Sequence, residues 1–363
     1  MNRLAMRWLG SKALVIACLL GITTAQAGGF ANPTMSASGL GVANAMVASA
    51  DDVSAAAYNP AGIAWQDGIQ AMVGVDFQYR NSSVELPAGI GTNGGGAGNP
   101  NHLYASWMPH DGNFGVSMAY NKPYEIDNNW TSTGQAALDL NRLSLDAIFA
   151  VNSSLALAAG IDWYLSTLSM NTPGQSFASS DKTSFGGHAS MKWKAAPMWS
   201  VGVMARLGGK LKYSNSLSQA FSLKLPDEIT VAVAHDVADA VRLEFDANWS
   251  RWSRVKSLND QAISMRDSIT LMTGATWFWR ENSQLRFGYA YDQGANKGTA
   301  YNPLIADQTA HKLSLGAGGD LYGVHADVAV GYAFHPKKNV SGAYAGTYRD
   351  RRFSFALSVA KRF

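Results

Sequence analysis

The chain has 363 residues, of which 47% are hydrophobic and 11% aromatic, with 29 Lys and Arg against 26 Asp and Glu. Residues 1–27 hold three of the basic residues and none of the acidic ones, so the remaining 336 residues carry 26 charges of each sign. A nucleic-acid-binding protein would need a strong basic excess, and we therefore expect no nucleic-acid partner. Those 336 residues contain no apolar run near 18 residues, which excludes a helical membrane protein.

The first 27 residues have the pattern of a secretory signal peptide. Three basic residues precede a short apolar run at 13–22, and Ala25-Gln26-Ala27 has the small-x-small pattern of a cleavage site. A membrane-spanning helix needs ~20 residues, so this run is too short to be one. We expect export and cleavage before Gly28.

Lipoprotein cleavage at Val15-Ile16-Ala17-Cys18 is the alternative to an ordinary signal peptide. It would leave an apolar core of only five residues, and for that reason we favour the ordinary signal. Cys18 is the single cysteine of the chain. If it leaves with the signal, the exported protein has neither a disulfide nor a thiol nucleophile.

Apolar and polar residues alternate over long segments of the remaining chain. In the last segment one strand face consists of Phe353, Phe355, Leu357, Val359 and Phe363. In a second example, at 241–249, apolar residues alternate with charged or polar ones. Alternation over about ten residues suits a tilted strand that crosses a bilayer, whereas soluble strands average about 5–6 residues. We therefore predict an all-β fold, a transmembrane antiparallel β-barrel.

The alternation marks fourteen strands, an even number as in bacterial outer-membrane barrels. Their approximate bounds are 68–80, 101–109, 112–121, 137–151, 154–166, 183–195, 198–212, 219–236, 240–252, 267–280, 283–292, 309–319, 321–333 and 350–363. Tight turns such as Ala196-Pro197 alternate with longer connections such as 122–136 and 167–182. Short turns at one rim and long loops at the other are typical of such barrels.

Residues 28–66 do not alternate and precede the first strand. They are rich in small residues, with serines that suit helix caps, and they predict two short helices around 38–48 and 52–57. Such a segment cannot span a membrane, but a ring of fourteen strands encloses space for it. We therefore divide the chain into a signal (1–27), a hatch or plug inside the lumen (28–66) and the barrel (67–363).

Three motifs of this segment are specific enough to suggest a family. Ser38-Gly39-Leu40-Gly41, Ala50-Asp51-Asp52-Val53-Ser54 and Tyr58-Asn59-Pro60-Ala61-Gly62 resemble the N-terminal hatch of FadL-type outer-membrane transporters. Weaker similarity, such as Trp249-Ser250-Arg251-Trp252-Ser253, continues along the whole mature chain. The outer loops are compact compared with those of the family's fatty-acid members.

The resemblance implies transport of long-chain fatty acids or other hydrophobic compounds, such as aromatic hydrocarbons, across the bacterial outer membrane. In the family the ligand enters the barrel and leaves sideways through a wall opening beside the Asn-Pro-Ala element, where the third strand kinks. The resemblance therefore assigns the gate to Asn59, Pro60 and Ala61, with Gly115 as the kink site. Asn59 offers donors and an acceptor to strand backbone left unpaired by a kink. A simple turn is the plainer alternative for this element, because Asn, Pro and Gly favour turns.

Candidates for binding a ligand follow from the need for an apolar pocket with a few polar anchors. The apolar candidates in the hatch are Phe30, Met35, Leu40, Met46, Tyr58, Ile63 and Trp65. Lumen-facing candidates for pairing with a carboxylate headgroup are Arg142, Arg206, Arg242, Arg286 and Lys312. Packing of the hatch is the alternative role for the first set, and pairing with lumen acids such as Asp162, Glu244, Asp246 and Asp327 for the second. The terminal Phe363 looks like the sorting signal that barrel-assembly machinery reads.

Catalysis is not expected. His188 and Ser190 share a strand face, but that face is luminal, and the chain has no Gly-x-Ser-x-Gly elbow in a strand–helix context. Metal-ligand spacing is absent, so neither a metal nor another cofactor is expected. The expected partners are the outer-membrane bilayer, a hydrophobic small molecule and the barrel-assembly machinery, and we expect a monomer. A general aqueous porin and a structural or adhesive barrel remain the alternative functions.

Overall fold

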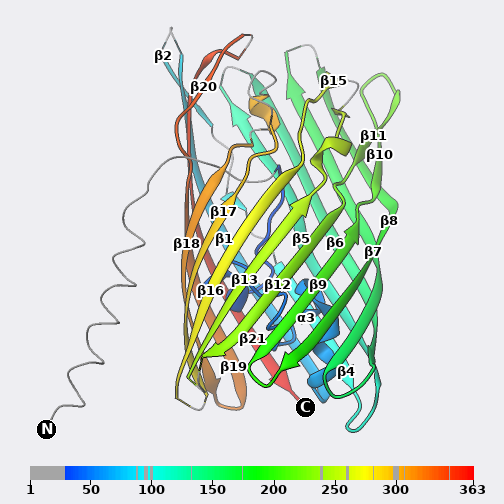
Figure 1. Ribbon diagram of the computed structural model, residues 1–363. Coiled ribbons are helices and arrows are strands. Elements are labelled where there is room, and N and C mark those ends of the chain that lie inside the picture. The colour runs from blue at the N-terminus through cyan, green and yellow to red at the C-terminus, as the bar shows by residue number, and fades with distance from the viewer. Residues whose placement is uncertain are drawn as a thin grey trace, which may run out of the picture.

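The computed structural model describes residues 29–363, except 87–88, 94–96, 99–100, 132, 174, 238–239, 259–260, 281, 297–301, 306 and 343. The predicted signal peptide and Cys18 lie outside the described residues. The described chain forms a closed antiparallel β-barrel (Figure 1), with β1 paired to both its sequence neighbour and the last strand. The predicted fold class, with fourteen barrel strands and a hatch in the lumen, is confirmed.

Most wall strands follow one another in chain order and pair with their neighbours. They are β1 (Gly68–Leu86), β4 (Asn101–Met108), β5 (Phe114–Trp130), β6 (Gly134–Ala150), β7 (Leu155–Thr172), β8 (Gln175–Ala196), β9 (Trp199–Leu207), β12 (Glu228–Val237), β13 (Val241–Ser250), β16 (Ser268–Arg280), β17 (Ser283–Asp292), β18 (Ala310–Leu321), β19 (Val324–Phe334) and β21 (Gly346–Arg362). Shorter pieces pair at the edge of the wall or within loops: β2 (Gly89–Asn93), β3 (Ala97–Gly98), β10 (Lys210–Ser214), β11 (Ala220–Lys224), β14 (Ser257–Leu258), β15 (Gln261–Ala262) and β20 (Lys338–Val340). Two loops contain short 3-10 helices, η3 (Trp252–Arg254) and η5 (Pro303–Ile305).

Each predicted strand overlaps a wall strand, but the predicted strands 198–212 and 219–236 each contain two strands, because β10 and β11 form a separate hairpin. The long loops predicted at 122–136 and 167–182 are also wrong. Segments 122–136 and 167–182 are mostly strand, because β5 continues to Trp130 and β6 begins at Gly134, while β7 continues to Thr172 and β8 begins at Gln175. These extensions pair residue by residue, as in Trp130 with Gly134. The polar composition that suggested loops therefore belongs to strand pairs that extend beyond the apolar band.

The two faces of the wall differ in polarity as the alternation predicts. On β13, Leu243 and Phe245 are each 46% exposed on the outside, whereas Glu244 and Asp246, which alternate with them, are buried in the lumen. Alternate outward residues are apolar on the other strands as well, for example Phe353, Phe355 and Leu357 on β21. An apolar exterior around a polar interior is the arrangement of a membrane barrel.

The N-terminal segment lies inside the barrel and ends before Gly68 (Figure 1, dark blue). It contains α2 (Ala37–Gly41), α3 (Ala55–Tyr58) and a 3-10 helix, η2 (Pro60–Trp65), and almost all of these residues are buried. Ser36 caps α2 by accepting a hydrogen bond from Gly39 N. The first helix is shorter than predicted, because Ala43 and Asn44 have positive φ values of 53° and 70° and turn the chain. No helix of the described residues is long and apolar enough to cross a membrane.

Candidate functional site: a lumen chamber beside an interruption of the wall

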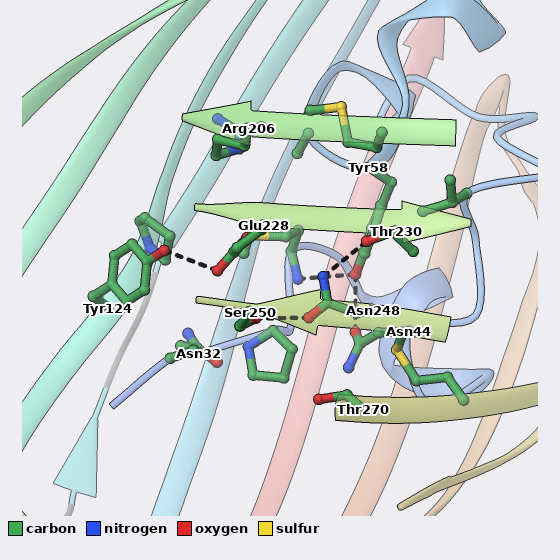
Figure 2. Close-up of a pocket in the computed structure, with 18 of the residues that line it drawn as sticks. Asn32, Asn44, Tyr58, Tyr124, Arg206, Glu228, Thr230, Asn248, Ser250 and Thr270 are labelled. Atoms are coloured by element: carbon green, nitrogen blue, oxygen red, sulfur yellow. Dashed lines mark hydrogen bonds between the residues drawn. The ribbon is translucent and has the colours of Figure 1, made fainter. Parts of the chain in front are cut away.

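A cavity of about 140 Å³ lies between the hatch and the barrel wall. Its lining comes from the hatch and from seven barrel strands, and includes Asn32, Tyr58, Tyr124, Arg206 and Glu228 (Figure 2). A smaller cavity of about 60 Å³ shares Asn32, Pro33 and Asn44 with it. We refer to the two together as the lumen chamber.

The wall is interrupted on one side of this chamber, along β5. Pairing of β4 with β5 ends at Leu103 and Tyr120, and the next partner on that side of β5 among the described residues is Asn93, opposite Trp130. The pairing with β6 also shifts register between Asn121 and Tyr124, which leaves Pro123 outside the ladder. Proline has no N–H to donate to a ladder, which explains the irregularity at this point.

Residues 29–35 of the hatch, here called the arm, cover the interruption from within. Asn32 N donates to Pro123 O at 2.7 Å, Asn32 Nδ2 donates to Lys122 O, and Glu125 N donates to Phe30 O at 3.0 Å. Ala31 forms an antiparallel bridge with Tyr124. Because Ala31, Asn32, Pro33, Pro123 and Tyr124 also line the chamber, the arm stands between the chamber and the irregular part of the wall.

Gly115, the predicted kink site, lies in regular structure. It pairs with Ile148 of β6, and a Cβ at this position would lie 2.7 Å from Met108 Sδ. The glycine therefore admits the Met108 side chain, which packs into the cluster beneath η2. The irregularity of the third barrel strand is at Asn121–Tyr124, so the position predicted for the kink is wrong.

Asn59, Pro60 and Ala61 lie at the start of η2, against β8. Asn59 Oδ1 accepts from Ala61 N, and Asn59 Nδ2 donates to Val47 O at 2.7 Å and to Met191 O at 3.0 Å. Pro60 occupies the first turn of η2, where a missing N–H costs nothing. This element thus fastens the hatch to itself and to β8, and its bonds do not go to β5. Its role in a gate stays a prediction.

Two carboxylates of β13 bind the hatch backbone directly. Asp246 Oδ2 accepts from Met46 N and Val47 N at 3.2 and 3.0 Å. Glu244 Oε1 accepts from Ala48 N at 2.6 Å and from Ser49 N at 3.1 Å. Four consecutive backbone N–H groups in the lumen therefore find acceptors on the wall, which a buried backbone requires. We call this contact the β13 clamp.

Inward glycines let the same hatch segment lie directly on the wall. A Cβ at Gly202 of β9 would lie 2.1 Å from Val47 O, and one at Gly288 of β17 would lie 2.2 Å from Ala43 N. Real Cβ contacts are never this short, so a side chain at either position would displace residues 42–50. The sequence alone does not distinguish these glycines or the clamp residues from other luminal residues, although the alternation places all of them on the luminal face.

The five basic candidates have different surroundings. Arg142 and Arg206 line the larger cavity, and Lys312 lines the smaller one. Arg286 is bound to Asp327 at 2.6 Å, and Arg242 to Asp236 at 2.6 Å near the short turns of the barrel. The alternative role, pairing of lumen bases with lumen acids, thus describes these last two and also Arg206, which binds Asp162 at 2.5 Å.

Arg142 differs from the other arginines in its bonding. It is 3% exposed, and its Nε has no hydrogen-bond partner among the described residues. Its contact with Asp162 Oδ1 is 3.8 Å long, whereas Arg206 Nη1 reaches Asp162 Oδ2 at 2.5 Å. A buried guanidinium normally has its donors bound, so Arg142 retains capacity for an anion in the chamber.

The apolar candidates divide into lining and packing residues. Met35 and Tyr58 line the chamber, and Tyr58 Oη forms a hydrogen bond with the side-chain amide of Asn44 at 2.9 Å. The remaining candidates pack elsewhere: Phe30 against Tyr124 and Trp252, Leu40 against Ala329 and Ala356, Met46 against Val42 and Tyr58, and Ile63 beneath η2. Trp65 lies at the short-turn end, where its Nε1 donates to Ser153 O.

The structure adds lining residues that the sequence did not single out. They are the polar residues Glu228, Thr230, Asn248, Ser250, Thr270 and Asp292, together with Pro123, Met204 and Met272. Their inward position follows from alternation, but their convergence on one cavity depends on where the hatch lies. No group of His, Asp and Glu that could hold a metal ion occurs among the described residues.

A fourteen-stranded barrel with an apolar exterior is typical of outer-membrane proteins, and in this one the N-terminal hatch occupies the lumen. The sequence model of the family described as "Outer membrane protein transport protein (OMPP1/FadL/TodX)" matches residues 132–360, and the chain belongs to this family. The family assignment predicted from the hatch motifs is therefore confirmed, and the protein is located in the bacterial outer membrane. The family description names transport proteins, which supports the expectation of no enzyme activity at the level of the family.

Several known proteins are similar to this chain. Outer membrane protein P1 of Haemophilus influenzae is 26% identical over 152 residues, a match that covers 39% of this chain and 32% of that protein. A FadL homologue of Pseudomonas aeruginosa has a similar structure, with a TM-score of 0.80 at 19% identity over 93% of this chain and 100% of that chain. The toluene transporter TodX of Pseudomonas putida matches with a TM-score of 0.65 at 14% identity, over 86% of this chain and 94% of that one.

The toluene transporter TbuX of Ralstonia pickettii gives the same TM-score of 0.65 at 14% identity, covering 89% of this chain and 98% of that chain. These structural likenesses concern the fold. The chain spans about a third of the curated relative that it matches.

Proposed function

We propose that this protein carries hydrophobic compounds across the outer membrane, by capture in the lumen chamber and lateral release through the wall at the β5 interruption. The supporting observation is that the arm lines the chamber and also bonds to the unpaired stretch of β5. Movement of one short segment would therefore join the chamber to the bilayer. Relatives of similar fold are named as toluene transporters and as a FadL homologue.

Lateral release suits the physical chemistry of such a cargo. Apolar surface is costly to hydrate, at roughly 25 cal/mol per Å². A route through a water-filled pore would incur this cost, whereas an opening in the wall leads directly into the hydrocarbon of the bilayer. Among the described residues the arm makes three hydrogen bonds to β5 and three more with Gln78, Tyr104 and Lys312. Its displacement therefore breaks individual bonds and leaves the β ladder of the wall intact.

For cargo that carries a carboxylate, we assign the anchor to Arg142. The residue is buried, lines the chamber and has donors available. A guanidinium binds a carboxylate through two parallel hydrogen bonds, a geometry that also orients the ligand. Arg206 is less suited, because Asp162 already occupies one of its donors at 2.5 Å.

Locking the arm to β5 tests the gate. Ala31 and Tyr124 are bridge partners, and Cα atoms of antiparallel partners lie about 4.5–5.5 Å apart, within the range of a disulfide. We expect the variant A31C/Y124C to lose most uptake of radiolabelled toluene and oleate when oxidised, and to regain it on reduction. The matched control is V231C/A247C, a bridge between paired residues of β12 and β13 away from the arm.

Equal uptake by the oxidised and reduced forms of A31C/Y124C would contradict the lateral gate. Loss of uptake in the oxidised control as well would show an effect of any cross-link in the barrel and would also count against the assignment. The extent of cross-linking is measured independently by the change in mobility of the unheated protein on gels.

A further inference from the structure

One wall of the chamber carries a row of polar side chains that the transport of a hydrocarbon does not require. Thr230, Asn248, Thr270 and Asp292 lie on the neighbouring strands β12, β13, β16 and β17. They are direct cross-strand partners, Thr230 with Asn248, Asn248 with Thr270, and Thr270 with Asp292. The row therefore crosses four strands at one level of the barrel, with Glu228 and Ser250 beside it.

The members of the row bind one another and retain further hydrogen-bonding capacity. Asn248 Nδ2 donates to Thr230 Oγ1 at 2.9 Å, and Ser250 Oγ donates to Asn248 Oδ1 at 2.7 Å (Figure 2). An amide nitrogen has two hydrogens and a hydroxyl has one of its own. In the described part of the chain, one N–H of Asn248 and the O–H of Thr230 are therefore not committed to a protein acceptor. Glu228, which accepts from Tyr124 Oη at 2.9 Å, adds acceptor capacity beside the row.

Other parts of the chamber lining are apolar. The hatch contributes Met35, Val47 and Ala57. The wall contributes two methionines next to the row, Met204 as the β9 partner of Thr230 and Met272 two residues after Thr270 on β16. Methionine side chains adapt to ligands of different shape and make favourable contacts with aromatic rings. A ligand that fits both the polar row and the apolar lining has an apolar ring or chain and at least one polar substituent.

The size of the chamber favours a single ring. The larger cavity has a volume of about 140 Å³. An apolar cavity of about 150 Å³ is known to hold benzene. A long extended alkyl chain would need the arm to leave the lumen before it could bind, whereas a single substituted ring fits the closed state.

We propose that the chamber selects single-ring compounds with a hydroxyl substituent over unsubstituted hydrocarbons and long alkyl chains, with Asn248 as the specificity-determining residue. This inference rests on the proposed transport function and narrows its cargo. A hydroxyl both donates and accepts, so it matches the free donors of Asn248 and Thr230 and the acceptors of Glu228. A hydrocarbon in the same place would remove water from these groups without replacing its hydrogen bonds, which is how a polar site rejects an isostere that lacks the polar group.

The experiment compares 4-methylphenol with 1,4-dimethylbenzene, two molecules of nearly equal shape that differ by a hydroxyl in place of a methyl group. Binding is measured with the full mature chain in lipid nanodiscs, and partition into empty nanodiscs is subtracted. We expect roughly tenfold or greater preference for 4-methylphenol, the value of about one uncompensated hydrogen bond. Equal binding of the two compounds, or preference for the hydrocarbon, would overturn the proposal.

Variants test the assignment to the row. Asn248→Leu removes the amide at nearly constant volume, and we expect the preference to fall to within about twofold while binding of 1,4-dimethylbenzene is kept or improved. The matched control is Asn339→Leu, since Asn339 is an exposed residue of β20 outside the chamber. A preference that survives unchanged in Asn248→Leu would refute the role of this residue. If that variant does not assemble, Thr230→Val and Thr270→Val carry the same expectation.

The experiments distinguish failure of the proposed selectivity from failure of the proposed transport function. If decanoate and 1,4-dimethylbenzene bind as well as 4-methylphenol, and the oxidised A31C/Y124C variant still blocks uptake, transport stands and the selectivity for hydroxyl groups fails. If none of the probes binds above the empty nanodisc and uptake does not respond to the cross-link, the proposed function itself fails.

Discussion

At the scale of single residues, the neighbours of a buried carboxyl group decide its protonation state, and Asp307 is an example. It lies in the loop between β17 and β18 and is 2% exposed. Its Oδ2 accepts from Ala295 N and, at 3.0 Å, from Asn296 N, and so closes the loop. Burial, and next the nearby Asp292, raise the pKa of Asp307 from its usual value near 3.8 to about 8, against the effect of the N–H groups. Lys338, which also faces Asp307, favours the charged form.

The shift predicts how the stability of this loop depends on pH. Between about pH 4 and pH 8 the closed loop holds a proton that the open loop releases, so the stability of the closed form falls as the pH rises through this window. We expect proteolysis of segment 293–309 to increase from pH 6 to pH 9 in the wild type. Asp307→Asn keeps an acceptor and removes the ionisation, so it should show no such increase beyond that of the protease itself. An equal increase in both proteins would contradict the assignment.

At the scale of elements, the hatch has one part bound to the wall and another part that covers the wall interruption. Residues 42–50 are held by the β13 clamp and by close approach to Gly202 and Gly288. The arm binds the wall at other places, through hydrogen bonds to β5 and to Gln78, Tyr104 and Lys312. This division suggests that the clamp keeps the hatch in the lumen while the arm moves.

Removal of the clamp tests this division. Glu244→Ala with Asp246→Ala leaves four buried backbone N–H groups without acceptors, at about 1–3 kcal/mol for each unsatisfied group. We expect hydrogen exchange of residues 42–50 to rise by orders of magnitude, while the barrel still assembles and migrates as a folded species on unheated gels. Glu85→Ala is the control, because its ion pair with Arg349 is largely exposed. Unchanged exchange in the double variant would show that packing alone holds the hatch.

At the scale of the whole molecule, the barrel and its contents have separate roles. The strand ladder closes the wall through the pairing of β1 with β21, and the hatch fills the lumen without contributing to that closure. The aqueous porin, an alternative at the level of the sequence, needs an open lumen. The hatch residues are almost all buried between the walls, which favours a closed state.

Conductance in planar bilayers separates the two functions. We expect the intact protein to show little steady current, because the hatch residues are almost all buried against the wall. Deletion of residues 29–66 should give a large open channel, since the lumen of a wide barrel without a plug conducts ions. A large current from the intact protein would contradict the proposed transporter function and favour a general aqueous porin. The sorting role of Phe363 stays a prediction, as do the monomeric state and the expected domain bounds.

The alternation in the sequence is by itself enough to predict the barrel strands, because a wall with one luminal and one lipid-facing side requires apolar residues at every second position. It also placed Arg142, Glu244, Asp246 and Asn248 on the luminal face. The hatch motifs identified the family without any coordinates.

Only the tertiary structure decided what those luminal residues contact. Glu244 and Asp246, which the sequence offers as alternative partners of the lumen bases, bind hatch backbone instead, because the N–H groups of residues 46–49 lie beside them in the folded chain. The break in β5 falls at Asn121–Tyr124 and not at Gly115, because Pro123 cannot join a ladder while Gly115 accommodates Met108. Alternation records which face a side chain occupies; it contains no information about which distant segment fills the lumen in front of that face.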